Sequence, residues 1–130
     1  MMLEYPEKLS YTARHLWVEA DEDERVATVG ITEELLDRLV EVVSVDMPML
    51  GDELDIDTFC IHLHLENRIH HLRSPLTGRV VEINREVLDN ASLLHLAPYT
   101  NWLYRMEFDD ADELHLLMSA AQYAKYLDQF

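Results

Sequence analysis

The chain has 130 residues, of which 48% are hydrophobic and 28% charged, so its composition supports one packed domain and excludes a disordered protein. Asp and Glu number 26 against 10 Lys and Arg, a formal charge of −16 that repels phosphate backbones and anionic lipid headgroups. Nucleic acid and membrane surfaces are therefore poor partners for this chain, whereas a basic protein surface would be attracted to it.

Cysteine usage indicates the compartment. Cys60 is the only cysteine, which precludes an intrachain disulfide, a thiolate metal cluster and a Cys-x-x-Cys redox motif. The first residues carry charges and Pro6 instead of the apolar core of a signal peptide, and no run approaches the roughly 20 apolar residues of a membrane span. We expect a soluble, cytoplasmic protein.

The first predicted elements are two strands. Residues 11–18 and 26–31 are rich in β-branched and aromatic side chains, and the acidic run 19–24 lies between them. This pattern predicts a hairpin with a solvated tip. The acidic run lacks the glycine and the spaced oxygen ligands of a calcium loop, so we assign no metal site to it.

A short helix is predicted next. Thr32 is a suitable N-cap, and the leucines and valine that follow recur with helical spacing. Strand-like residues 42–45 follow, and the segment 47–52 then forms a turn because it contains Pro48 and Gly51.

A second hairpin is predicted in the middle of the chain. Residues 59–65 alternate apolar and polar side chains with the period of a strand that buries one face. Asn67 and Arg68 have the composition of a tight turn, since Asn tolerates the left-handed backbone conformation. Apolar residues resume after it, a second turn is expected at 74–78, and another strand is expected at 80–83.

The C-terminal third contains apolar runs at 93–96 and 102–108, separated by a loop at 98–101. After three aspartates, residues 114–127 show an apolar stripe with helical spacing. We predict one long final helix that covers an open edge or face of a sheet.

Taken together, these segments resemble the glycine cleavage system H protein, a small carrier that holds lipoic acid on a lysine at a hairpin tip. Tyr11-Thr12-Ala13-Arg14-His15-Leu16-Trp17-Val18 resembles the family's Tyr-Thr-x-x-His-Glu-Trp-Val. Val45-Asp46-Met47-Pro48 with Gly51-Asp52 is similar to Val-Glu-Leu-Pro-x-x-Gly-Asp. Ser74-Pro75-Leu76-Thr77-Gly78-Arg79-Val80-Val81-Glu82-Ile83-Asn84 is similar to Ala-Pro-Val-Ser-Gly-Glu-Val-Val-Glu-Val-Asn, and Pro98-Tyr99 with Trp102-Leu103 resembles a shortened Pro-Tyr-Gly-x-Gly-Trp-Leu.

The resemblance implies a mostly β, lipoyl-domain-like barrel-sandwich hybrid that spans residues 9–130, with two sheets packed face to face, a short internal helix and a C-terminal helix. Residues 1–8 are then an N-terminal extension. The sequence departs from the family pattern at two further positions, where Leu16 replaces a glutamate and Val40 replaces a glycine.

The resemblance locates the lipoyl-attachment position and shows that it has changed. The family's lipoyl lysine follows the glycine of the Gly-Asp turn by sixteen residues, a count that reaches Asn67 from Gly51 in this sequence. A carboxamide offers no nucleophilic amine for acylation, so we expect no lipoate or other cofactor there. The neighbouring Arg68 cannot substitute, because its guanidinium stays protonated.

We therefore interpret the chain as a non-catalytic docking module related to lipoyl carriers. Its partners would be proteins, among them the glycine cleavage enzymes or the enzymes that attach lipoate. Three residues near the expected attachment hairpin or in the family motifs are candidates for the docking surface: His15, Glu66 and Arg68. We predict no enzymatic activity, because the serines lack a nucleophile-elbow context, Cys60 lies in an apolar strand pattern and no glycine-rich phosphate loop is present.

An alternative hypothesis concerns four histidines in the second hairpin. They can be solvent-facing strand residues, ligands of a divalent transition metal, or groups that make a partner contact pH-dependent. The four residues are His62, His64, His70 and His71. A two-residue turn at Asn67 and Arg68 would pair His64 with His71, whereas a three-residue turn centred on Asn67 would pair His64 with His70.

Overall fold

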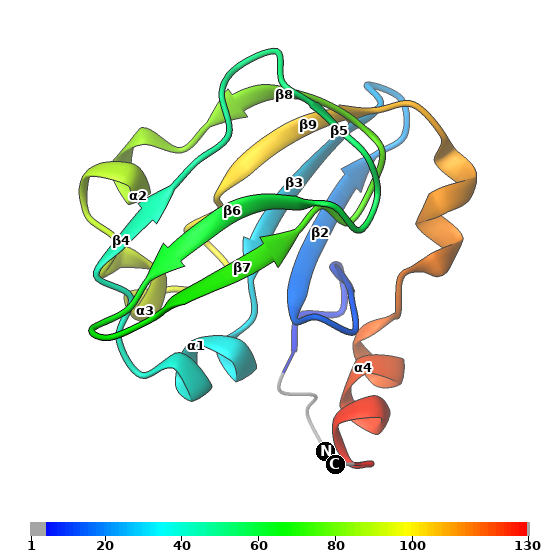
Figure 1. Cartoon of the computed structure of the whole chain (residues 1–130). Helices are drawn as coiled ribbons and strands as arrows, with labels where there is room; N and C mark the ends of the chain where they lie inside the picture. The colour runs from blue at the N-terminus through cyan, green and yellow to red at the C-terminus, as the bar shows by residue number, and fades with distance from the viewer. Residues whose placement is uncertain (1–4, 130) are drawn as a thin grey trace.

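The computed structural model describes residues 5–129 and consists of two antiparallel sheets packed face to face (Figure 1). The strands are β1 (Ser10–Tyr11), β2 (Leu16–Asp21), β3 (Val26–Ile31), β4 (Ser44–Asp46), β5 (Glu53–Leu54), β6 (Phe59–His64), β7 (Ile69–Arg73), β8 (Gly78–Ile83) and β9 (Tyr104–Phe108). The helices are α1 (Glu33–Leu39), α2 (Arg85–Asp89), α3 (Leu93–Leu96), the 3-10 helix η1 (Ala111–Leu116) and α4 (Ala120–Leu127).

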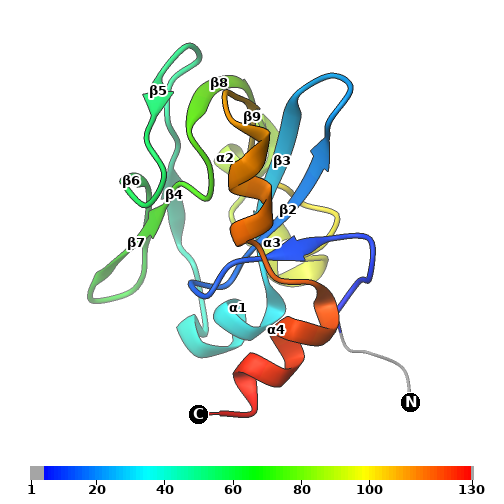
Figure 2. The ribbon, with the colours of Figure 1, turned by 90° about the vertical axis from the view of Figure 1, so that its right-hand side faces the viewer.

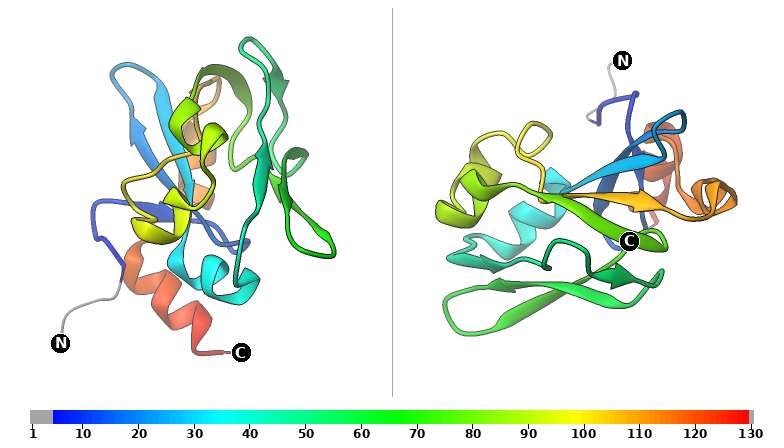
Figure 3. Two further views of the ribbon diagram at one scale, coloured as in Figure 1. Left: turned by 90° about the vertical axis from the view of Figure 1, so that its left-hand side faces the viewer. Right: turned by 90° about the horizontal axis from the view of Figure 1, so that it is seen from above.

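The larger sheet has the strand order β1-β2-β3-β9-β8-β5 and the smaller one has the order β4-β6-β7. Seen from above, the two sheets form separate layers (Figure 3). Alternate residues of both sheets fill the space between the layers, and Val29, Leu63 and Met106 are fully buried there. The predicted mostly β architecture of two packed sheets is confirmed. No helix within residues 5–129 is long and apolar enough to cross a membrane.

The prediction of one continuous strand over residues 11–18 is wrong. The chain turns sharply between β1 and β2, and the two strands pair with each other, so that Tyr11 lies opposite Trp17. The Thr12 hydroxyl accepts hydrogen bonds from the Leu16 and Arg14 amides at 3.2 and 3.3 Å, and His15 adopts a positive φ of 70°. This local hydrogen bonding competes with the extended conformation and projects residues 13–15 out of the sheet.

Helix α1 begins as predicted, with the Thr32 hydroxyl accepting a hydrogen bond from the Leu35 amide. It ends in a strained turn. The Glu41 amide donates to the Leu39 carbonyl at 2.8 Å across Val40, whose φ and ψ are 69° and −63°. These are the dihedral angles of a classic γ-turn, which is rare for any residue and strained for a β-branched one.

The single C-terminal helix that the sequence predicts is in fact two helices, η1 and α4, separated by residues 117–119. Ser119 and Gln122 form a reciprocal capping box that starts α4 independently of η1. Between the helices, Met118 exchanges two 2.8 Å backbone hydrogen bonds with Tyr11. This segment and α4 therefore cover the edge at β1, as predicted for this region (Figure 2), and Tyr123 of α4 contacts Thr32, which caps α1.

A second, aromatic core holds α4 in place. The rings of Tyr11 and Tyr123 stack with their centroids 4.8 Å apart, and Tyr5 meets the Tyr123 ring edge-on at 5.0 Å. Trp17 is 2% exposed, and its indole donates a 3.0 Å hydrogen bond to the Pro98 carbonyl. Tyr5, which the sequence assigns to an extension, thus contributes to the packing of the C-terminal helix.

Two short helices, α2 and α3, were not predicted from the sequence. Asn84 caps α2 by accepting a hydrogen bond from the Glu86 amide at 3.2 Å. The pairing of Asn84 with an acidic first turn was the available signal. It was masked because the apolar strand pattern of β8 runs directly into the cap.

We predict that Val40→Gly stabilises the protein. Relief of strain worth about 1 to 3 kcal/mol should exceed the conformational entropy cost of glycine, which is roughly 0.5 to 1 kcal/mol. The Val40 side chain is 80% exposed, so its removal sacrifices little packing. The free energy of unfolding, measured by urea denaturation, should rise by about 1 kcal/mol. The matched variant Val43→Gly, at an exposed residue whose φ is not positive, should lower it, and equal losses in both variants would contradict the predicted strain.

Candidate functional site

The β6–β7 hairpin carries the residues that the sequence singles out, and its turn differs from the predicted one. The Leu65 amide donates to the Arg68 carbonyl at 2.9 Å, so the turn consists of Glu66 and Asn67 rather than Asn67 and Arg68. Asn67 also lacks the positive φ that we expected of it. Glu66, Asn67 and Arg68 are all exposed at the end of the hairpin.

This turn sets a register that neither predicted alternative describes. His62 lies opposite His71, whereas His64 lies opposite Ile69 and His70 lies opposite Leu63. Because side chains alternate between the faces of a strand, His62, His64 and His71 share the outer face and His70 points to the inner one.

The four histidines therefore do not converge. The Nδ1 atoms of His62 and His71 are 2.6 Å apart, while His64 Nε2 lies 2.7 Å from a carboxylate oxygen of Asp46 on the neighbouring strand β4. Among residues 5–129, no group of three or more His, Cys, Asp or Glu side chains is arranged to hold a metal ion. The structure thus gives the metal-site hypothesis no support.

A basic hollow of about 390 Å³ lies where the edge of β7 approaches α1 and the turn before β2. We call it the β7 hollow. In Figure 1, α1 lies directly below the β6–β7 hairpin. The lining residues fall into a basic group and an apolar group with no carboxylate in either. They are Arg14, His15, Arg38, Arg68, His70, His71 and Arg73, together with Ala13, Leu35, Leu39 and Leu72.

His15 connects the β7 hollow to the aromatic core through a chain of hydrogen bonds. Arg38 Nη1 lies 3.4 Å from His15 Nε2, and His15 Nδ1 lies 2.7 Å from Tyr123 Oη. Because a guanidinium can only donate, Nε2 must accept, and the ring proton is then on Nδ1 and is donated to Tyr123. The Tyr123 hydroxyl is in turn 3.0 Å from the Thr32 hydroxyl.

The electrostatic environment of the hollow disfavours further positive charge. Burial lowers the pKa of His15, and the Arg38 guanidinium lowers it further, although Glu34 acts in the opposite direction. Burial likewise lowers the pKa of His70, with smaller contributions from Arg68 and His71. These lowered pKa values favour the neutral form of both rings at neutral pH, and the four arginines give the hollow positive charge.

Only part of this arrangement could be found from the sequence. Two of the three docking candidates, His15 and Arg68, line the β7 hollow, whereas Glu66 lies at the hairpin turn outside its lining. Arg14, Arg38 and Arg73 were missed. They come from three separate segments and form no local motif, so only their tertiary contacts bring them together.

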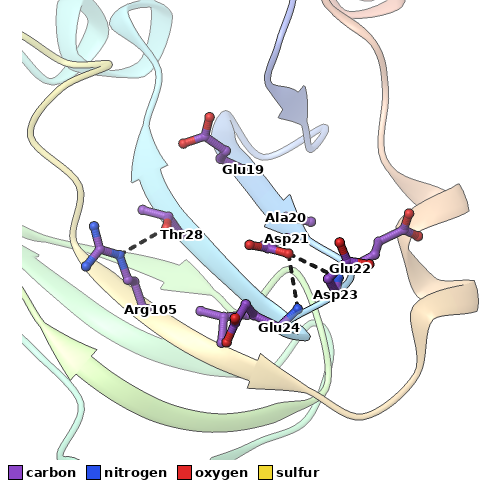
Figure 4. Close-up of a pocket in the computed structure, with 9 residues that line it drawn as sticks. Glu19, Ala20, Asp21, Glu22, Asp23, Glu24, Thr28 and Arg105 are labelled. Atoms are coloured by element: carbon purple, nitrogen blue, oxygen red, sulfur yellow. Dashed lines mark hydrogen bonds between the residues drawn. The ribbon is translucent and has the colours of Figure 1, made fainter.

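The acidic run 19–24, at the end of β2 and in the turn to β3, lines a second hollow of about 740 Å³ together with Val26, Thr28 and Arg105 (Figure 4). The Asp21 carboxylate caps the turn by accepting hydrogen bonds from the Asp23 and Glu24 amides at 3.0 and 3.1 Å. The other carboxylates are spread around the turn and exposed to solvent. Their arrangement is that of the solvated hairpin tip that the sequence predicts.

The thiol of Cys60 packs against the core between the two sheets, 3.6 Å from the Tyr104 hydroxyl. Burial raises the pKa of this thiol to about 11, so the nucleophilic thiolate is scarce at neutral pH. Within residues 5–129, this thiol hydrogen-bonds to the Tyr104 hydroxyl and to no histidine, so no activating base adjoins it. The thiol has the properties of a structural core residue.

The lowered pKa of His70 predicts a stability change with pH. A histidine whose pKa is lower in the folded than in the unfolded chain stabilises the fold fully above the unfolded value, near 6.5, and this contribution is lost as the pH falls below it. Between about pH 7.5 and 5.5, the protein should therefore lose more unfolding free energy than the His70→Asn variant. Urea denaturation at each pH measures the difference. The exposed His115→Asn serves as the control, and equal pH dependence of the two variants would contradict the prediction.

Comparisons with known proteins agree with this fold. The sequence profile of the glycine cleavage H-protein matches residues 9–130. The glycine cleavage system H protein of Streptomyces avermitilis is 38% identical over 122 residues, covering 93% of this chain and 95% of that protein. That of Kocuria rhizophila is 34% identical over 98% of this chain and its own full length.

A solved structure gives the same result in three dimensions. The crystal structure of a glycine cleavage system H protein from Mycobacterium marinum superposes with a TM-score of 0.83 at 26% identity, covering 95% of this chain and 99% of that one. The lipoyl-domain-like barrel-sandwich fold is thereby confirmed. The chain belongs to the glycine cleavage H-protein family.

Proposed function

We propose that this member of the H-protein family acts as a protein-docking module in the cytoplasm and carries no lipoate at the β6–β7 hairpin. The observation that carries the proposal is the residue at the hairpin turn. Asn67 lies there, exposed, where the resemblance to the family places the lipoyl lysine. A neutral carboxamide is not acylated by an activated carboxylic acid, so the position presents a polar side chain but no attachment point.

The lysines that the sequence does contain support the same proposal. Lys8 and Lys125 are the only two in the chain. Lys8 lies just before β1 and is 3.7 Å from Glu19 of β2, and Lys125 belongs to α4. Neither lies on the β6–β7 hairpin, and therefore neither can replace a lysine at its turn.

The hairpin nevertheless has the properties of a recognition surface. Its outer face exposes Phe59 and Ile69, which are 58% and 48% accessible, beside the paired rings of His62 and His71. Glu66 and Arg68 at the turn add one charge of each sign. Exposed apolar and aromatic side chains bordered by charges are typical of protein interfaces.

The candidate partners follow from the family. The relatives are named as components of the glycine cleavage system. We propose that the partners are the other proteins of that system or the enzyme that attaches lipoate. Non-catalytic docking also agrees with the absence of an activated nucleophile around Cys60, since its thiol is protonated at neutral pH.

Docking predicts saturable binding to at least one of these enzymes from the same organism. In biolayer interferometry, the Glu66→Ala, Arg68→Ala double variant should bind about tenfold more weakly than the unmodified chain, because two interface charges are lost. Arg85→Ala, which removes an exposed arginine from α2, is the matched control and should bind normally. Failure of the unmodified chain to bind any of these enzymes would overturn the docking proposal.

A second experiment tests whether the acceptor residue alone was lost. Asn67→Lys should become lipoylated by the lipoate-attaching enzyme, because it restores an amine at the hairpin turn without changing the β6–β7 register. Intact mass spectrometry should show one added lipoyl group on this variant and none on the unmodified chain. Lipoylation of the unmodified chain would contradict the proposal directly.

A further inference from the structure

The distribution of charge in this protein is strongly uneven. Acidic residues outnumber basic ones by 26 to 10, yet the β7 hollow is lined by Arg14, Arg38, Arg68 and Arg73 and by no Asp or Glu. Four of the eight arginines in the sequence therefore line one small hollow. Placing like charges together is unfavourable in the absence of a counter-charge, and it is a common feature of sites that bind anions.

We propose that the β7 hollow binds a small organic anion, a carboxylate or a phosphate monoester carried on a short apolar group. This binding site shares Arg68 with the proposed docking surface but does not require docking. It uses guanidinium groups that recognise an anion, whether or not a protein partner contacts the hairpin.

The arginines are available for such a ligand. In the described part of the chain, no carboxylate lies within ion-pair distance of Arg14, Arg68 or Arg73, whereas Arg38 is paired with Glu34 at 2.9 Å. The Arg73 guanidinium lies over the Phe59 ring, 4.8 Å from its centroid, which orients this side chain. Guanidinium groups bind carboxylates and phosphates through paired hydrogen bonds.

The apolar part of the lining selects an organic anion over an inorganic one. Leu35, Leu39 and Leu72 contribute to the wall; they are anchored in the core, 4%, 7% and 2% exposed, and present a small, fixed hydrocarbon surface to the hollow. An inorganic ion would leave this surface in contact with water. A short alkyl group would cover this surface and remove it from water, which favours binding.

The turn before β2 gives the hollow a defined shape. Hydrogen bonds of the Thr12 hydroxyl hold residues 13–15 out of the sheet, and His15 is fixed between Arg38 and Tyr123. The lining thus comes from three elements that are positioned by the core rather than from one flexible loop. Preorganisation of this kind lowers the entropy cost of binding.

The proposal is tested by titrating the isotopically labelled full chain at low ionic strength and following amide shifts by two-dimensional NMR. The probes are hexanoate, hexyl phosphate, uncharged hexanamide and inorganic phosphate. Hexanoate or hexyl phosphate should bind with a Kd of about 1 mM or below, shifting the amides of residues 13–15 and 68–73. Hexanamide and inorganic phosphate should each bind at least about tenfold more weakly, because hexanamide lacks the negative charge and inorganic phosphate lacks the alkyl group.

Matched variants assign the binding to the arginines. Arg14 and Arg68 are both exposed. The Arg14→Gln, Arg68→Gln double variant should bind the tighter of the two organic anions with a Kd about tenfold or more higher, while the amide signals of the rest of the chain stay unchanged. Arg85→Gln should bind like the unmodified chain. Absence of binding by both organic anions, equal binding of hexanamide or inorganic phosphate, or equal binding by the double variant would each overturn the proposal.

Discussion

The two-residue turn at Glu66 and Asn67 is the constraint on which the rest of the β6–β7 hairpin depends. A side chain's face is fixed by its place in the register, and a slip of one residue would move every side chain of the strand to the opposite face. The observed register buries Leu63 and Leu72 between the sheets and directs His70 to the inner face. The same turn therefore determines the core, the outer recognition surface and part of the β7 hollow.

Electrostatics give the protein two dissimilar regions. The β2–β3 tip gathers solvent-exposed carboxylates, whereas the β7 hollow gathers guanidinium groups beside buried leucines. The two are separated by the body of the domain, because the acidic tip and α1 lie at opposite ends of the larger sheet (Figure 1). A charged surface that approaches the molecule therefore meets opposite local charges at the two regions, which favours one orientation over another.

Local signals predicted the elements whose physics is local. The Thr32 cap, the alternation in β6 and the β2–β3 hairpin could be read directly, because each depends on neighbouring residues. The errors arise where a polar side chain competes with a longer pattern. The Thr12 hydroxyl breaks a predicted strand, and the Ser119 capping box divides a predicted helix.

The candidate site was predictable only in part, for the same reason. The hairpin follows from motif order and spacing, whereas its exact turn depends on backbone angles that Asn-Arg composition does not determine. The β7 hollow could not be predicted, since Arg14, Arg38 and Arg73 meet only after the two sheets and α1 have packed.

The environment of Cys60 has a practical consequence for experiments on this protein. Its thiol is the only one in the chain, it is substantially buried, and its pKa of about 11 keeps it protonated at neutral pH. Thiol-reactive dyes and spin labels attack thiolates, so they will react with it slowly. A cysteine introduced at the exposed hairpin turn can therefore be labelled selectively in the otherwise unmodified chain, without first removing the native thiol.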